Sequence, residues 1–201
     1  MPVQPSAEDI LSFDRRSGGY ESSFLQGLFF DRVHQATLDS LPPAICPQDI
    51  LDIGCGTGRL LRKAALRWPN AQLFGVDPAE GMVSAAYQWS PKGAFYVSPA
   101  EALPLPDSSI DLALSTTSFH HWFDQHEGLR QVARVLRRGG WFCLTDIVTP
   151  YGLSHIARHG RPIEEAGRQA ILEQVGLKVE TQCRKMGRFL LITLARKIEA
   201  A

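Results

Sequence analysis

The sequence lacks net charge, because 21 lysine and arginine side chains balance 21 aspartate and glutamate side chains. This balance gives no electrostatic reason to expect a nucleic-acid partner, since nucleic-acid-binding domains usually carry a basic excess. Cysteine is scarce, and the four cysteines form no Cys-x-x-Cys pair. The absence of such a pair argues against a zinc site and a disulfide scaffold, and we expect no bound metal.

Long apolar segments are also missing. The strongly apolar run FLLITLA, near the C-terminus, is far too short to cross a bilayer. The N-terminal residues MPVQPSAEDI lack the basic and apolar regions of a signal peptide. The sequence therefore predicts a cytoplasmic protein with no membrane partner.

Segments with strand and helix patterns alternate along most of the chain. Residues 1–43 are expected to form an N-terminal helical cap, with a helix from about 21 to 40. Beyond the cap, the predicted strands are DILDI, AQLFGVD, AFYVS, SIDLALS and WFCLTDIV. The predicted helices are RLLRKAALRW, AEGMVSAAYQW and EGLRQVARVLRR, the last closed by Gly139 and Gly140. The strands are continuously apolar, which is typical of a parallel sheet with helices on both faces.

The C-terminal segment departs from this alternation. After a helix predicted over 163–175, the strands LKVETQCRKM and RFLLITLARK are joined only by a tight turn at Gly187. So short a connection permits only an antiparallel hairpin. We expect one domain over residues 1–201, whose core over 44–201 is a doubly wound, Rossmann-like α/β fold ending in this hairpin.

Three glycines follow the first predicted strand in the stretch LDIGCGTGRL, residues 51–60. A dinucleotide-binding loop would have a small residue where this chain has Arg59, and a phosphate-binding P-loop would continue with Gly-Lys-Ser or Gly-Lys-Thr. Neither pattern matches. The loop therefore predicts a ligand that approaches the backbone closely without a phosphate at the helix end.

Two acidic residues end neighbouring strands beside this loop. The carboxylate of Asp77 can accept hydrogen bonds from both hydroxyls of a ribose. A ligand carboxylate would suit the helix N-terminus after the loop, and a ligand ammonium would suit the neighbourhood of Asp52. Together these groups predict a ligand with a ribose and an amino-acid tail.

Four motifs in order carry a family resemblance: LDIGCGTG, GVDPAEGM, AEALPLPDSSIDLALS and RVLRRGGWFCLTD. With them the chain, from about residue 50 to 196, resembles the class I S-adenosylmethionine-dependent methyltransferases of the small-molecule, ubiquinone-biosynthesis-like (type 11) group. The resemblance implies a seven-stranded sheet in the order 3-2-1-4-5-7-6 with strand 7 antiparallel. It also implies S-adenosyl-L-methionine as cofactor and a small molecule as methyl acceptor.

The resemblance further implies which residues bind the cofactor. The methionine end would contact Asp52, Gly54, Cys55, Gly56 and Gly58. The ribose would contact Asp77, and the adenine would lie near Pro78, Met82, Ala100 and Glu101. Thr116 would pass under the methyl donor, and Tyr20 matches a position where relatives close an N-terminal segment over the cofactor. Where the family usually has an acid for the adenine amine, this chain has Pro99, so either Glu101 substitutes or the contact is lost.

The stretch TSFHHWFD, residues 117–124, supplies the candidate catalytic group. It follows a strand at the sheet edge where α/β proteins bind ligands. Methylation of an O–H or N–H group releases a proton, which a histidine can accept near neutral pH. We predict His120 as this base and His121 as the second candidate. The alternative is that the pair caps and packs under the next helix.

Three functions are compatible with these features. The first is methyl transfer from S-adenosylmethionine to a small molecule. The second is a protein that binds the cofactor but has lost catalysis, which Pro99 leaves open. The third is an RNA or protein methyltransferase, against which the neutral charge and the lack of an Asn-Pro-Pro-Tyr motif argue. The sequence indicates neither the acceptor atom nor the oligomeric state.

Overall fold

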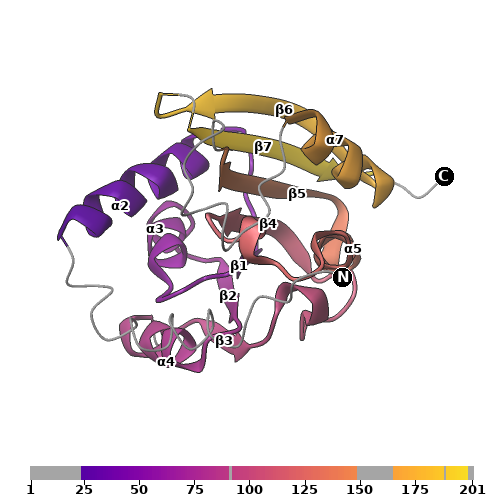
Figure 1. The fold of residues 1–201 in the computed structure, drawn as a ribbon. Coiled ribbons are helices and arrows are strands. Elements are labelled where there is room, and N and C mark those ends of the chain that lie inside the picture. The colour runs from indigo at the N-terminus through magenta and orange to yellow at the C-terminus, as the bar shows by residue number, and fades with distance from the viewer. Residues whose placement is uncertain (1–23, 91, 149–164, 188, 199–201) are drawn as a thin grey trace.

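The computed structural model describes residues 24–90, 92–148, 165–187 and 189–198, and strands and helices alternate along them (Figure 1). The first half of the described chain comprises α2 (Phe24–Asp39), β1 (Asp49–Ile53), α3 (Arg59–Arg67), β2 (Gln72–Asp77), α4 (Glu80–Trp89), β3 (Ala94–Val97) and the 3-10 turn η1 (Ala100–Ala102). The second half comprises β4 (Ile110–Thr116), the 3-10 turn η2 (Phe119–His121), α5 (Gln125–Val135), β5 (Leu136–Ile147), α7 (Glu165–Gln174), β6 (Leu177–Lys185) and β7 (Leu190–Lys197).

The seven strands form one sheet in the order β3-β2-β1-β4-β5-β7-β6. Strands β1 to β5 pair in parallel, whereas β7 runs antiparallel to both β5 and β6. The turn of the terminal hairpin contains Met186 and Gly187 at positive φ, 51° and 66°. The predicted fold class, strand order and antiparallel hairpin are confirmed.

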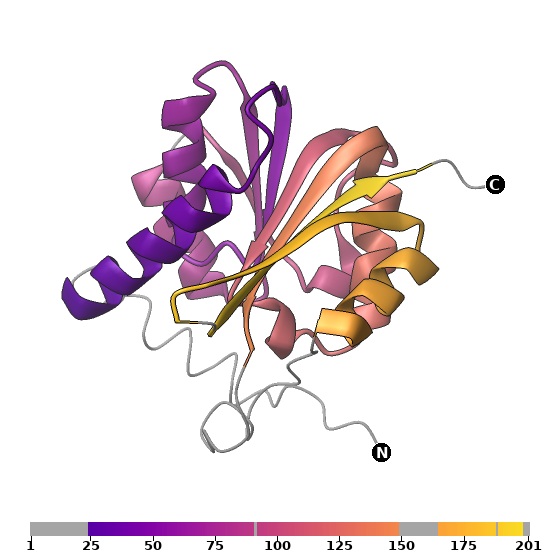
Figure 2. The ribbon, with the colours of Figure 1, turned by 90° about the horizontal axis from the view of Figure 1, so that it is seen from above.

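Helices cover both faces of the sheet (Figure 2). On one face, buried side chains of α2, α3 and α4 pack against the strands, among them Val33, Leu61 and Val83. On the other face, α5 and α7 contribute Leu129 and Leu172, and η1 and η2 pack there too. Successive residues of β5 alternate between the two cores, as the pleat of a strand requires.

The predicted end of the helix EGLRQVARVLRR is wrong. Helix α5 ends at Val135, and the segment through Gly139 and Gly140 already belongs to β5. The Arg137 guanidinium lies 2.8 Å from carboxylates of Asp49 and Asp111, which draws this segment toward the sheet. A Cβ on Gly140 would lie 2.8 Å from the Arg137 carbonyl oxygen. The glycine therefore permits a close backbone approach in a bulged strand rather than a helix cap.

Parts of the predicted helical cap lie outside the described residues. Helix α2 corresponds to the helix expected from about 21 to 40, but residues 1–23, including Tyr20, are not described. The division into a cap and a core stays a prediction. Among the described residues, no helix is both long enough and apolar enough to span a bilayer.

Candidate active site

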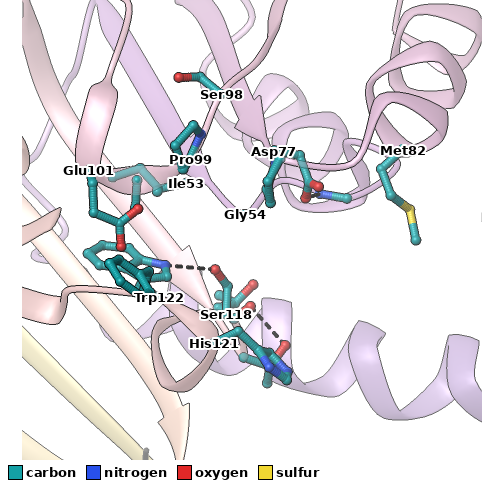
Figure 3. A pocket seen from close by; sticks show the side chains of 16 residues that line it. Ile53, Gly54, Asp77, Met82, Ser98, Pro99, Glu101, Ser118, His121 and Trp122 are labelled. Carbon is teal, nitrogen blue, oxygen red and sulfur yellow. Dashed lines mark hydrogen bonds between the residues drawn. The ribbon is translucent and has the colours of Figure 1, made fainter. Parts of the chain in front are cut away.

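A cavity lies at the edge of the sheet where β1, β2 and β4 end (Figure 3). The loops after these strands supply most of its wall. The lining residues are Ile53, Gly54, Gly56, Asp77, Pro78, Met82, Ser98, Pro99, Ala100, Glu101, Thr116, Thr117, Ser118, His121, Trp122 and Phe123. Eight of the predicted site residues are therefore among them: Gly54, Gly56, Asp77, Pro78, Met82, Ala100, Glu101 and Thr116.

Asp77 ends β2 and connects two backbone segments at the cavity. Its Oδ2 accepts a hydrogen bond from the Gly56 N–H at 2.9 Å, and its Oδ1 accepts one from the Ala79 N–H at 3.0 Å. The side chain is only 8% exposed and lines the cavity. Each carboxylate oxygen can accept more than one hydrogen bond. Asp77 can therefore also accept hydrogen bonds from the hydroxyls of a ribose.

Asp52 lies within β1, immediately before the lining residues Ile53 and Gly54. Its side chain is 1% exposed, and its Oδ1 atom has no hydrogen-bond partner. Burial, with a smaller contribution from the charge of Asp77, raises the pKa of Asp52 to about 8. A buried carboxylate with an unused acceptor is costly, and a nearby cation would relieve that cost. The site thus suits a ligand ammonium, and that contact stays a prediction.

Gly54 allows the loop after β4 to approach the loop after β1. Its φ is +75°, and a Cβ at this position would lie 2.0 Å from the Ser118 Oγ atom. Ser118 in turn accepts a hydrogen bond from Trp122 Nε1 at 3.0 Å. Gly54 therefore leaves backbone at the cavity wall where any larger residue would displace Ser118.

Two predicted contact residues lie behind the cavity wall. Cys55 is buried, and desolvation raises the pKa of its thiol well above the usual range, so it is no nucleophile. Gly58 precedes α3 in the left-handed conformation, with φ of +77°. A Cβ there would lie 3.4 Å from Ala86 and Phe95. Gly58 therefore packs the loop against α4 and β3, and Cys55 packs in the core on the same face of the sheet. Like Asp52, neither is among the lining residues.

The wall around β3 contains Pro99 and Glu101. Glu101 accepts a hydrogen bond from the Asp124 N–H at 2.9 Å, just before α5 begins. This contact fixes its carboxylate beside the cavity (Figure 3). Pro99 also lines the cavity and offers no side-chain acceptor. Of these two residues, only Glu101 can accept a hydrogen bond from a ligand through its side chain.

The two histidines of η2 face different surroundings. His121 lines the cavity (Figure 3), whereas the His120 side chain is not among the lining residues. His120 is 6% exposed and bonds Asp146 twice, through its backbone N at 2.9 Å and its Nδ1 at 2.7 Å. The two imidazole centroids are 4.0 Å apart. The geometry therefore gives His120 an anchoring position and His121 the position beside a bound ligand.

Sequence reasoning missed Ser98, Thr117, Ser118 and Asp146. Thr117 has φ of 51°, which bends the chain sharply after β4. A positive φ is rare for threonine, so the sequence does not predict this bend. Asp146 is an acid at the end of a predicted strand, the same signal that singles out Asp52. Among the described residues, no group of three or more histidine, cysteine or acidic side chains could hold a metal ion.

Comparison with known proteins identifies the fold and its family. Residues 51–144 match the family model described as a methyltransferase domain. Malonyl-[acyl-carrier protein] O-methyltransferase of Hahella chejuensis is 34% identical over 115 residues, which cover 56% of this chain and 41% of that protein. The 27-O-demethylrifamycin SV methyltransferase of Amycolatopsis mediterranei is 32% identical over 155 residues, 66% of this chain and 54% of that protein. The chain contains a class I S-adenosylmethionine-dependent methyltransferase domain.

A solved structure agrees with this methyltransferase fold. One chain of the complex between the Haloferax volcanii Trm112 methyltransferase activator and a methyltransferase superimposes with a TM-score of 0.78 at 20% identity, covering 93% of this chain and 98% of that one. The methyltransferase domain implies S-adenosylmethionine as cofactor, and the unused Asp52 oxygen and the Gly54 backbone fit its amino-acid end. The chain spans about half the length of the two curated relatives named above, 41% and 54%.

Substitution of Asp77 tests the ribose contact. We expect Asp77→Ala to weaken binding of S-adenosylhomocysteine by about 1–3 kcal/mol, because ligand hydroxyls would lose a charged acceptor. Calorimetric titration measures the affinity, and thermal unfolding reports whether the loop still folds. Asp107→Ala is the matched control, since Asp107 is an exposed acid that pairs with Arg134 away from the lining residues. Unchanged affinity in a normally folded Asp77→Ala protein would show that the ribose lies elsewhere.

The raised pKa of Asp52 predicts proton release on cofactor binding. With a pKa of about 8, Asp52 is mostly protonated at pH 7, and a ligand ammonium favours its ionised form. We expect release of up to about 0.9 proton at pH 7, and an affinity that rises with pH toward 8 and then levels off. Calorimetry in buffers of different ionisation enthalpy measures the release. The Asp52→Asn protein should release less, and equal release by both proteins would contradict the ammonium contact.

Proposed function

We propose that this protein transfers the methyl group of S-adenosylmethionine to a small-molecule acceptor. The observation that carries the proposal is the juxtaposition, around one cavity, of Asp77 with Asp52 behind it at one end and of His121 with two aromatic side chains, Trp122 and Phe123, at the other. The acids suit the ribose and ammonium of the cofactor. The imidazole and aromatic groups suit an uncharged organic acceptor and its departing proton.

Each group would have a separate task with the cofactor bound. Asp52 would offset the ammonium charge, Asp77 would accept the ribose hydroxyls, and Pro78 and Met82 would flank the adenine. Glu101 would be the carboxylate of the cavity wall two residues from Pro99, where the family usually has an acid. The loop after β4 lines the same cavity and would border the rest of the ligand.

The chemistry needs positioning more than covalent participation. Bound S-adenosylmethionine would supply a methyl group on a positively charged sulfur, for transfer to an electron-rich acceptor atom as the carbon–sulfur bond breaks and S-adenosylhomocysteine is left. The cavity walls hold the acceptor in line and exclude water, which can supply most of the rate acceleration. His121 can accept the proton that an O–H or N–H acceptor loses.

The names of two relatives support an organic acceptor that is methylated on oxygen. The Hahella chejuensis protein is named as an O-methyltransferase of a malonyl group on acyl carrier protein, and the Amycolatopsis mediterranei protein as a methyltransferase of demethylrifamycin. Acyl carboxylates and hydroxyl groups are therefore the first acceptor classes to test.

Binding and turnover test the function. We expect S-adenosylmethionine and S-adenosylhomocysteine to bind and NAD not to bind in calorimetric titrations. With acyl, phenolic, hydroquinone and amine acceptors, we expect at least one class to yield S-adenosylhomocysteine. Comparable NAD affinity would contradict the cofactor assignment. Cofactor binding without turnover would favour the non-catalytic alternative, and turnover only with RNA or protein would favour the third function.

The two histidines can be separated by rate and stability. We expect His121→Ala to lower the rate about 100- to 10,000-fold with unchanged thermal unfolding, if it accepts the acceptor's proton. His120→Ala should lower both the rate and the unfolding temperature, because Asp146 loses its buried partner. His126→Ala is the matched control on the exposed start of α5. A slow His120→Ala protein of normal stability beside a fast His121→Ala protein would assign the base to His120.

A further inference from the structure

Arg168 on α7 is a fully buried charged residue that no part of the cofactor site uses. Its relative exposure is 0%. The Nη1 group donates a hydrogen bond to the Leu191 carbonyl at 3.0 Å, whereas Nε and Nη2 have no partner. A buried guanidinium with one hydrogen bond is costly compared with an apolar side chain of similar size. Packing alone therefore does not explain an arginine here.

The position of Arg168 brings it to the end of β5. Leu191, whose carbonyl it binds, pairs directly with Asp146 in the antiparallel ladder between β7 and β5. Asp146 is 1% exposed. Burial lowers the pKa of Arg168 to about 10, and the charge of Asp146 opposes that shift. The guanidinium is thus charged at neutral pH and is bonded to the residue that pairs with the buried acid Asp146.

Two other charged side chains act on Arg168 in opposite directions. Glu165 on α7 and Arg184 on β6 both act on the pKa of Arg168, in opposite directions. These two side chains form an ion pair with each other at 3.3 Å. Of the two acids that act on the pKa of Arg168, Asp146 has the larger effect.

Asp146 connects this buried charge to the η2 turn. Its Oδ2 accepts from the His120 backbone N and its Oδ1 faces His120 Nδ1, so one carboxylate holds both the main chain and the ring. A carboxylate can only accept, so Nδ1 of His120 carries the proton in this bond. The next residue, His121, lines the cavity. A shift of Asp146 would therefore move the turn that presents His121.

We propose that Arg168 is a positioning residue: its buried charge offsets that of Asp146, and Asp146 thereby holds η2 where His121 reaches the cavity. Only the role of His121 in this proposal rests on the proposed function. The coupling of Arg168 to Asp146 and to His120 can be measured without any acceptor.

A double-mutant cycle of thermal unfolding at neutral pH tests the coupling. Arg168→Met removes the charge at similar length, and Asp146→Asn removes the opposite charge. We expect Arg168→Met alone to lower the unfolding midpoint by roughly 6–12 °C, and by less than half as much when Asp146→Asn is already present. The control is Leu172→Ala, one turn further along the same buried face of α7, which should lower the midpoint equally with and without Asp146→Asn. An equal effect of Arg168→Met in both backgrounds would overturn the proposal.

A second measurement reads the turn itself. Nitrogen-15 NMR of the His120 ring should show the Nδ1–H form in the wild-type and Arg168→Lys proteins, and a mixture of forms in Arg168→Met. Unchanged His120 signals in Arg168→Met would show that Arg168 has only a packing role. If Arg168→Met does not fold alone, Arg168→Gln takes its place in the cycle, and recovery of folding in the Arg168→Met, Asp146→Asn protein supports the coupling.

Kinetics separate this proposal from the proposed function. With an acceptor found, Arg168→Met should bind S-adenosylhomocysteine as the wild type does, because Arg168 does not line the cavity, but should turn over at least 10-fold more slowly. Arg168→Lys should retain most of the rate. Wild-type turnover in a folded Arg168→Met protein would refute the positioning role and leave the function intact. A positive double-mutant cycle with no acceptor found would support the coupling of Arg168 to Asp146 and count against the proposed function.

Discussion

The hydrogen bonds accepted at the end of β2 are the constraint on which the cofactor site depends. The Asp77 carboxylate accepts from Gly56 and Ala79, and the Val76 carbonyl accepts from the backbone N–H groups of Gly54 and Cys55. These bonds make the glycine loop, the strand end and the start of α4 one unit. They also bring the charge of Asp77 close enough to act on the pKa of Asp52, whose own burial has the larger effect. The folded loop therefore favours a cationic ligand before any ligand binds.

The same loop depends on a close contact with the segment after β4. Because Gly54 has no side chain, the Ser118 hydroxyl can approach its Cα, and Trp122 then donates to that hydroxyl. The edge-to-face contact of Phe119 and Trp122, with centroids 5.0 Å apart, packs η2 into the core beneath. A change at any of these residues therefore acts on both the cofactor end and the histidine end of the cavity.

Sequence reasoning predicted the features whose causes are local. Periodicity predicts the alternation of strands and helices, and turn length predicts the hairpin. The strand order follows only from the family resemblance, and the glycines and acids mark their own loop. The start of β5 was predicted wrongly because Arg137 is drawn into the sheet by Asp49, which lies 88 residues away. The choice between His120 and His121 depends on Asp146, 26 residues from His120. Contacts with partners so far away along the chain cannot be predicted from a short window of sequence.

Two buried acids beside the carboxyl end of β4 differ in one physical respect. Asp146 has both oxygens engaged within the chain, by His120 and by the Ile147 N–H, whereas Asp52 keeps one oxygen without a partner. The turn that carries His121 is thus ordered during folding, and no binding energy is needed to orient it. The Asp52 site is completed only by a ligand. Because the two acids lie on β5 and β1, on either side of β4, a ligand ammonium at Asp52 can be bound without disturbing the bonds that hold the histidine turn. The free oxygen of Asp52 and the bonds of Asp146 therefore belong to different strands of the sheet.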